Sequence, residues 1–511
     1  MESNYLKIMT ISKKLYSKIR PLNLNSFHHF LLSNFLLIPL VLNSFFSNDK
    51  AYLVESDDST CGIYCKNALF FPEYFENKSF DQYYFQKSLN SFSAGLIMRI
   101  FHIKLSEVNA NQILEIQSYF LLVIMIPILI SIKKVLYFSG LEYWAIYTFI
   151  VVNSINLKYL SYSQESPDTT AIFFSLLALS AYLKNKYNLL LIITILSSYI
   201  QPQLKLICYI FLIFFSFPKI KINFKINKNE IITKFILITI FFLFILVLFM
   251  EIYKDEEAVI YLSSYTIVLL LPLSIIAASI YLSLIINYSI KFSLFNNLIR
   301  NFNHKKIRIN IITLVLIEVF NFLIRSYFAR GEQQSGTSTL VRQLYTLISF
   351  FYMSIQQPFK FFIPHVVMFG PVFIIVFILI IKNIGIDKVY SVHIAYVVLS
   401  IFFLLSCIDP ESRHLVSFLP IIVIVLVVCF NFPKRILIFI VICNILFSRF
   451  FATMYTTRLN SDEFLLKMGP WYNNIDYIKA AMLTVLLFIF TNQLLPTTNL
   501  FRVNFVWPNG K

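Results

Sequence analysis

The sequence predicts an all-α integral membrane protein, a single domain over residues 1–511 with about 11 to 14 transmembrane helices. Of its 511 residues, 58% are hydrophobic and 14% are charged, which is more apolar than the core of a soluble domain requires. Apolar runs of about 16 to 25 residues recur along the chain, and a helix needs about 20 residues to cross a bilayer. These continuous runs lack the alternation of a transmembrane barrel.

The individual spans follow from these runs. We expect them at 30–46, 118–132, 143–157, 169–183, 187–201, 204–217, 231–250, 259–290, 309–324, 366–381, 392–407, 415–431, 436–448 and 480–495. The run 259–290 is long enough for one tilted helix or for a pair kinked around Pro272. The run 30–46 follows basic residues, and no cleavage site of small residues comes after it. We therefore interpret it as a retained signal anchor.

The charges predict the orientation of the chain. With the N-terminus on the inner side, the inner segments hold 25 of the 43 Lys and Arg residues and 4 of the 26 Asp and Glu residues. This basic bias follows the positive-inside rule. Nearly all other carboxylates fall on the outer side, which suggests a working face there, and Glu318 alone lies inside a span. The net charge of +17 is thus a topology signal, and no module typical of nucleic-acid binding is present.

Two outer segments are long enough to fold on the membrane surface. The segment 47–117 is rich in aromatic residues, and Ser88–Phe101 has the spacing of an amphipathic interfacial helix. The segment 325–365 contains Leu340–Ile355, which favours a second interfacial or re-entrant helix. Cys61 and Cys65 lie in the first segment. They could form a local disulfide in an oxidising compartment or be inert packing residues, and the sequence leaves both alternatives open. The remaining four cysteines are expected to be packing residues.

Polar residues that could carry chemistry form clusters in the outer segments. A carboxylate such as Asp168 at the start of a helix is explained equally well by capping and by function. For the hinge 409–414 and for Asp57 and Asp58, solvation is an alternative of similar weight. Glu318, inside a span, is expected to be paired with Asn321 or Arg325 or to be functional. The candidate residues are Asp57, Asp58, Asp81, Asp168, Arg330, Glu332, Asp409, Glu411, Arg413 and His414.

The order of these features resembles membrane glycosyltransferases of the GT-C superfamily. Asp81-Gln-Tyr-Tyr-Phe-Gln-Lys-Ser-Leu is similar to the element D-x-Y-R-x-Q-R-x-L of bacterial members, with Tyr84 and Lys87 where Arg is usual. Ser166-Pro167-Asp168 before an apolar helix, and Glu411-Ser-Arg-His-Leu415 leading to Pro420, also look like segments common in that superfamily. The resemblance covers most of the chain as a pattern, although each motif is short.

The resemblance implies a sugar donor linked to a polyprenyl phosphate, and a glycan, lipid or protein acceptor. A catalytic carboxylate would lie in the first outer segment, with Asp57, Asp58 and Asp81 as candidates, and would accept the acceptor's proton. Arg413, His414 or Arg330 would offset charge on the departing phosphate, and Glu332, Asp409, Glu411 and Asp168 would bind substrate. Whether a divalent metal such as Mg²⁺ or Mn²⁺ assists through Asp57 and Asp58 is left open.

Two other functions compete with the glycosyltransferase. A transporter or flippase for a lipid-linked or polar solute would place ionisable residues at mid-membrane in paired halves, and the sequence has one such carboxylate and no visible duplication. A polysaccharide polymerase or ligase also has large outer loops with Arg and His, but the longest loop here is early in the chain. The membrane is expected to be the bacterial plasma membrane or the endoplasmic reticulum.

Overall fold

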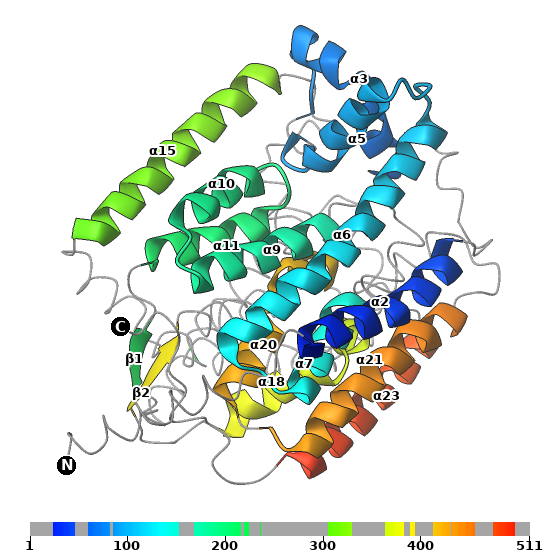
Figure 1. Cartoon of the computed structure of the whole chain (residues 1–511), viewed down its shortest axis with the longest axis vertical. Coiled ribbons are helices and arrows are strands. Elements are labelled where there is room, and N and C mark those ends of the chain that lie inside the picture. Colours follow the sequence, from blue (N-terminus) through cyan, green and yellow to red (C-terminus); the bar gives the residue numbers. More distant parts are fainter. Residues whose placement is uncertain are drawn as a thin grey trace.

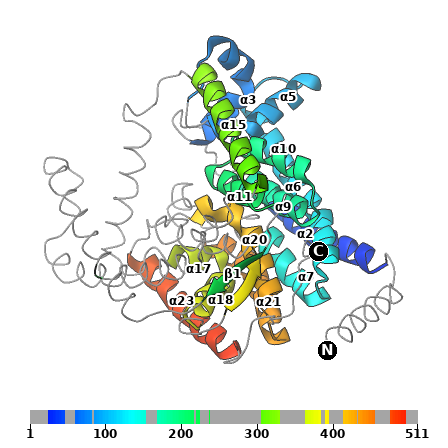
Figure 2. The ribbon, with the colours of Figure 1, turned by 90° about the vertical axis from the view of Figure 1, so that its left-hand side faces the viewer.

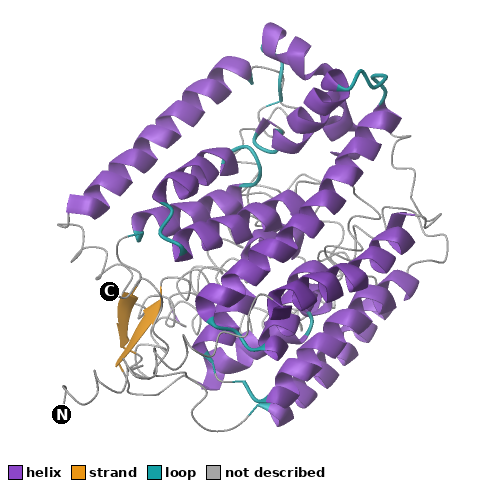
Figure 3. Ribbon diagram, in the orientation of Figure 1, coloured by secondary structure: helices purple, strands orange, loops and turns teal. Residues whose placement is uncertain are grey.

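A computed structural model describes residues 24–45, 60–81, 85–152, 168–215, 219–223, 236, 305–329, 363–382, 389–393, 412–430, 432–454 and 474–495. This part of the chain is built mainly from helices (Figure 3). Three helical segments are long and apolar enough to cross a membrane, namely Glu107–Leu136, Lys305–Phe328 and Tyr477–Leu494. They agree with the prediction of a helical membrane protein.

The first half of the chain supplies most of the helices around the candidate site. These helices are α2 (Leu24–Phe45), α3 (Thr60–Asn77), α5 (Leu89–Ile100), α6 (Glu107–Leu136), α7 (Gly140–Tyr147), the π-helix η2 (Thr148–Val152), α9 (Asp168–Leu183), α10 (Tyr187–Ser197) and α11 (Pro202–Ile213). The second half supplies α15 (Lys305–Phe328), α17 (Ile363–Phe369), α18 (Pro371–Lys382), the 3-10 helix η4 (Ser412–Phe418), α20 (Leu419–Cys429), α21 (Lys434–Met454) and α23 (Asn474–Leu494).

Helix α9 lies at the centre of the assembly. It packs against α6, α10, α11, η4 and α20, and most of its side chains are buried. A helix that is apolar around most of its circumference is expected at such a central position. Each predicted span that falls mostly within the described residues coincides with a helix. The span 259–290 and the helix Leu340–Ile355 lie outside these residues, as do the spans 231–250, apart from residue 236, and 392–407, apart from residues 392 and 393.

Local sequence signals explain where several helices begin and end. Helix α6 starts at Glu107, earlier than the predicted span, because the hydroxyl of Ser106 accepts a hydrogen bond from the Asn109 amide at 3.3 Å. At Gly370 the predicted span 366–381 divides into α17 and α18. Gly370 has a positive φ of 62°, and its amide donates to the Val366 carbonyl at 2.8 Å. This left-handed helix end is a glycine position.

The strands β1 (Lys219–Asn223) and β2 (Val389–His393) form an antiparallel ribbon. The ribbon was not expected from the sequence, and β2 overlaps the start of the predicted span 392–407, most of which lies outside the described residues. Both strands come from segments that the charge pattern assigns to the same side of the membrane. Figure 1 places the ribbon at one end of the molecule and helices α3 and α5 at the other.

Candidate functional site

Helices α3 and α5 pack closely together at the end of the molecule that we call the α3–α5 end (Figure 1). Helix α5 is the helix predicted at Ser88–Phe101, and it buries the small residues Ser91, Ala94 and Gly95. A Cβ added at Gly95 would lie 2.1 Å from the Ala68 carbonyl oxygen and 2.8 Å from the Phe71 ring. Only glycine therefore permits this approach of the two backbones.

Arg99 joins the same two helices by hydrogen bonds. Pro72 lies inside α3 and has no amide hydrogen, so the carbonyl of Ala68, four residues earlier, lacks its usual helical donor. The Arg99 Nη1 donates to that carbonyl at 3.2 Å, and its Nη2 donates to the carbonyl of Leu69. The guanidinium also lies 4.6 Å from the centre of the Phe71 ring. Arg99 thus fixes α5 on the irregular turn of α3.

An aromatic cluster fixes the segment that leads to Asp81. Phe80 is 1% exposed, and its ring centre lies 5.0 Å from that of Phe75, 5.2 Å from that of Phe92 and 5.3 Å from that of Phe85. The carbonyl of Asp81 accepts a hydrogen bond from the Phe85 amide at 2.9 Å. Asp81 is itself partly exposed, so a packed cluster holds the backbone while the carboxylate is accessible to solvent.

The end of α15 reaches this same segment from the other half of the chain. The Phe80 amide donates to the Phe328 carbonyl at 3.3 Å, and Ser79 and Ala329 form an isolated antiparallel bridge. The ring centres of Phe75 and Phe328 lie 4.8 Å apart. Asp81 therefore lies two residues from a backbone contact with Ala329, which directly precedes the candidate residue Arg330 in the sequence.

The turn between α10 and α11 completes this contact. The Tyr199 carbonyl accepts from the Leu89 amide at 3.0 Å, and the Tyr199 hydroxyl donates to Asn321 Oδ1 at 3.0 Å. The turn thus links α5, which follows the Asp81 segment, to α15.

Asp168 begins α9 and is 5% exposed. Its Oδ1 accepts a hydrogen bond from Gln201 Nε2 at 3.2 Å, and two residues further along α9 the Thr170 hydroxyl donates to Asn90 Oδ1 at 2.6 Å. A carboxylate at this position is favoured by the helix dipole. The structure therefore gives Asp168 a local structural role between α9 and α11, and α9 in turn contacts α5.

Arg413 and His414 lie in η4, whose side chains are described from Leu415 onward. Helix η4 packs against α9 and α11, and Leu415, Val416 and Phe418 are at most 1% exposed. The predicted hinge is therefore, over its described part, a 3-10 turn that leads into the buried helix α20. Its backbone lies against the same two helices that Asp168 and Gln201 connect.

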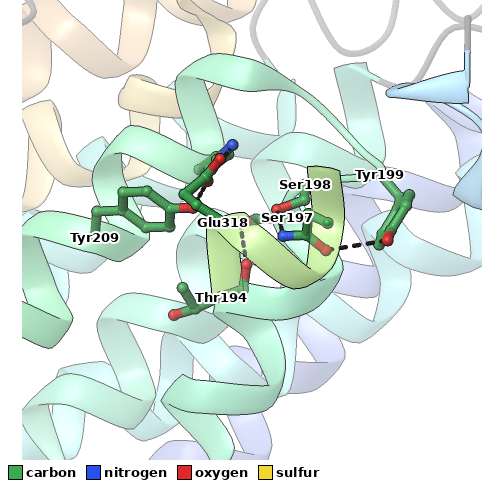
Figure 4. Close-up of polar contacts among 8 residues, drawn as sticks. Thr194, Ser197, Ser198, Tyr199, Tyr209 and Glu318 are labelled. Carbon is green, nitrogen blue, oxygen red and sulfur yellow. Dashed lines mark hydrogen bonds and ion pairs between the residues drawn. The ribbon is translucent and has the colours of Figure 1, made fainter. Parts of the chain in front are cut away.

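Glu318 has a different partner from the one expected. Its Oε1 forms an ion pair with Lys205 and accepts a hydrogen bond from the Tyr209 hydroxyl, both on α11 (Figure 4). Asn321, the partner expected from helical spacing, instead donates to the Ser198 hydroxyl at 2.7 Å. The expectation failed because spacing within one helix contains no information on which helix packs beside it.

Several candidate residues lie outside the described part of the chain. They are Asp57, Asp58, Arg330, Glu332, Asp409 and Glu411. Cys65 is buried, and the alternatives of a local disulfide with Cys61 and of inert packing both stay open. Among the described residues, no group of three or more His, Cys, Asp or Glu side chains is arranged to hold a metal ion, and Asp57 and Asp58, the residues considered for a metal, lie outside them.

Some residues that build this end of the molecule were not singled out from the sequence. Gln201 and Tyr199 lie in a short turn, and polar residues are common in turns, so their presence there does not indicate a function. Lys205 is a lone basic residue inside the apolar run 204–217. A charge in such a run is costly unless it is paired, and this signal could have identified it as the partner of Glu318.

Comparisons of the chain with models of protein families, with curated proteins and with solved structures found no match. The resemblance to GT-C glycosyltransferases therefore stays a prediction that rests on the motifs around Asp81, Asp168 and Arg413. What the structure contributes is the position of the Asp81 segment at the α3–α5 end, to which the start of α9 is linked by the hydrogen bond of Thr170 with Asn90.

Proposed function

We propose that this chain is a multi-pass membrane glycosyltransferase that transfers a sugar from a polyprenyl-phosphate donor to an acceptor at its α3–α5 end. One observation carries the proposal. The segment Ser79–Asp81, from the first predicted outer region, pairs with Phe328 and Ala329, which lead into the second. Two regions that are about 250 residues apart in the sequence thus meet beside a partly exposed carboxylate.

The proposed reaction needs a base and a cation on one face. An acceptor hydroxyl oxygen attacks the anomeric carbon, the bond from that carbon to the phosphate oxygen breaks, and the polyprenyl phosphate leaves with the bonding electrons. A carboxylate takes the hydroxyl proton, and a single displacement inverts the anomeric centre. Asp81, Asp57 and Asp58 are the candidates for this base.

Positive charge is required where the phosphate departs. Arg325 lies in the last turn of α15, and its carbonyl accepts a hydrogen bond from the amide of Ala329, which pairs with Ser79 two residues before Asp81. Arg330, Arg413 and His414 are further candidates for the phosphate contact, and Asp168, Glu332, Asp409 and Glu411 for contacts to the sugar. Membrane lipid surrounds the spans in this proposal, in a bacterial plasma membrane or in the endoplasmic reticulum.

The test is transfer of sugar from a synthetic polyprenyl-phosphate sugar by the purified protein and its variants Asp57→Asn, Asp58→Asn and Asp81→Asn. General-base catalysis contributes about 10² to 10⁴-fold, so one variant should lose turnover by about that factor while it still inserts into the membrane. Glu76→Gln is a matched control, because Glu76 is an exposed carboxylate of the same region. If all three variants stay within a few-fold of the control, the proposal fails.

A transporter or flippase is the second candidate, and the ion pair of Lys205 with Glu318 favours it. Ionisable groups inside predicted spans commonly mark a solute or proton pathway. The two side chains are 27% and 44% exposed, so a solute could reach them. Uptake of a polyprenyl-phosphate sugar into proteoliposomes that is abolished by Glu318→Gln, with no sugar transfer, would select this function.

A further inference from the structure

Helix α15 is attached to the rest of the molecule along one narrow face. Its buried residues are Ile307, Asn310, Leu314, Ile317 and Asn321, whereas Ile312 and Leu316 on the opposite face are 58% and 64% exposed. In lipid, burying apolar side chains between helices gives little driving force, because lipid tails are equally apolar. Polar contacts therefore decide where such a helix docks.

Polar contacts connect α15 to the α10–α11 pair at three levels along its length. Near its start, Asn310 Nδ2 donates to the Leu212 carbonyl at 2.8 Å and Asn310 Oδ1 accepts from Tyr187 at 3.2 Å. The ion pair of Glu318 with Lys205 follows, and Figure 4 shows Glu318 beside Tyr209. Asn321, bonded to Ser198 and Tyr199, is the third contact.

The ion pair is the strongest of these three contacts for a physical reason. A carboxylate and an ammonium attract each other more strongly than two neutral groups, and charge-assisted hydrogen bonds are about twice as strong as neutral ones. Either group alone would be costly in lipid. Each charge therefore favours the docked position of α15, where the other charge is available.

The docked position of α15 has a direct consequence at the α3–α5 end. Phe328 lies ten residues beyond Glu318, about 15 Å along the helix, and its carbonyl accepts from the Phe80 amide. Lys78 also lies 4.1 Å from the centre of the Tyr327 ring. A displacement of α15 would therefore move the backbone partner of the residues that precede Asp81.

We propose that Glu318 and Lys205 are positioning residues, which hold α15 so that its end fixes the segment Ser79–Asp81. The structural part of this proposal is independent of the activity. Its catalytic consequence, correct placement of the Asp81 carboxylate, rests on the proposed glycosyltransferase. The two parts are separated by one experiment with two measurements.

The first measurement is disulfide formation between cysteines introduced at Ser79 and Ala329, in a chain whose six native cysteines are replaced. Residues paired across antiparallel strands lie close enough for a disulfide. In native membranes with a mild oxidant, Glu318→Gln should slow cross-linking by about two- to fivefold, the effect of one partly exposed ion pair. The charge-exchanged variant Lys205→Glu with Glu318→Lys should restore the rate.

Two controls separate positioning from general damage. Thr313→Val changes a polar residue of α15 whose hydroxyl donates to the Ile309 carbonyl of its own helix, and it should leave the rate unchanged. A second cysteine pair at Asn90 and Thr170, which are hydrogen-bonded between α5 and α9, reports whether the rest of this end is folded. It should cross-link equally in all variants.

An unchanged Ser79–Ala329 rate in Glu318→Gln would overturn the proposal. Loss of both cross-links in Glu318→Gln would indicate unfolding of that variant. The charge-exchanged variant is then the test, and its failure to restore the Ser79–Ala329 rate would also overturn the proposal. The second measurement is sugar transfer, in which Glu318→Gln should lower kcat and the exchange should recover it. If cross-linking responds as expected but the parent chain transfers no sugar, the proposed function fails and the positioning role stands.

Discussion

The guanidinium of Arg99 supplies the hydrogen bond that Pro72 cannot give. In α3 the carbonyl of Ala68 would accept from the amide of residue 72, and proline has none. Arg99 donates to this carbonyl from α5 at 3.2 Å. Two residues 27 positions apart therefore depend on each other. Pro72 leaves the Ala68 carbonyl without a helical donor at the contact of α3 with α5, and Arg99 supplies a donor to that carbonyl.

The first prediction concerns this dependence. Arg99→Ala should lower the free energy of unfolding by about 2 kcal/mol, because a buried acceptor loses its donor and a cation–π contact disappears. In a Pro72→Ala background, the new amide can donate to Ala68, so the same change should cost about 1 kcal/mol less. Thermal unfolding in detergent, followed by tryptophan fluorescence, measures all four proteins. Strictly additive effects would contradict the relationship.

The second prediction concerns the close contact of α3 and α5. Gly95→Ala places a methyl group 2.1 Å from a backbone oxygen, which the helices can relieve only by moving apart. Overpacking of this kind costs about 1 to 3 kcal/mol. Gly140→Ala is the matched control, because its Cβ would meet its nearest neighbour, the His29 ring, at 3.8 Å. Equal unfolding midpoints for the two variants would count against the packing described here.

The third prediction concerns the break between α17 and α18. Gly370→Ala should destabilise the protein by about 1 kcal/mol, because an L-residue with a side chain is strained at a φ of 62°. Among the described residues, no atom lies within 4 Å of the new methyl group, so the expected cost comes from the backbone conformation. Gly370→Asn should cost less than Gly370→Ala, since Asn tolerates this conformation better. The reverse order would argue against a left-handed conformation here.

Hydropathy predicted the apolar helices within the described residues but not which of them contact one another. Apolar runs predicted a helix at 309–324 and another at 204–217, and both are present. The contact between them depends on Lys205 and Glu318, which lie more than 100 residues apart, and no periodicity links such positions. The meeting of Ser79 with Ala329 is equally invisible in the sequence. Candidate residues could therefore be found one at a time, whereas their grouping required the structure.

The fourth prediction tests the orientation derived from the charges. In a chain without native cysteines, a cysteine introduced at residue 60, the start of α3, should react with an impermeant thiol reagent that is applied to the non-cytoplasmic side of the membrane. A cysteine at residue 222, in β1, should react only after permeabilisation. The reason is that basic residues favour the inner side and α3 follows the first span. Reversed labelling at both positions would overturn the orientation and place the proposed site on the opposite face.

The last prediction asks whether Asp168 is structural or functional. The contacts of Asp168 favour a structural role. It begins α9, where the helix dipole stabilises its negative charge, and it accepts a hydrogen bond from the buried side chain of Gln201. Asp168→Asn keeps the size of the side chain and an acceptor but removes the charge. It should therefore lower the free energy of unfolding by about 1 kcal/mol and leave kcat for sugar transfer within a few-fold.

Asp168→Leu should cost more, about 2 to 3 kcal/mol, because Gln201 Nε2 is then buried without an acceptor. Adding Gln201→Leu should recover part of this loss, since both polar partners are then replaced by apolar groups. A fall in kcat of a hundredfold or more in Asp168→Asn, with an unchanged unfolding midpoint, would instead assign Asp168 to substrate binding.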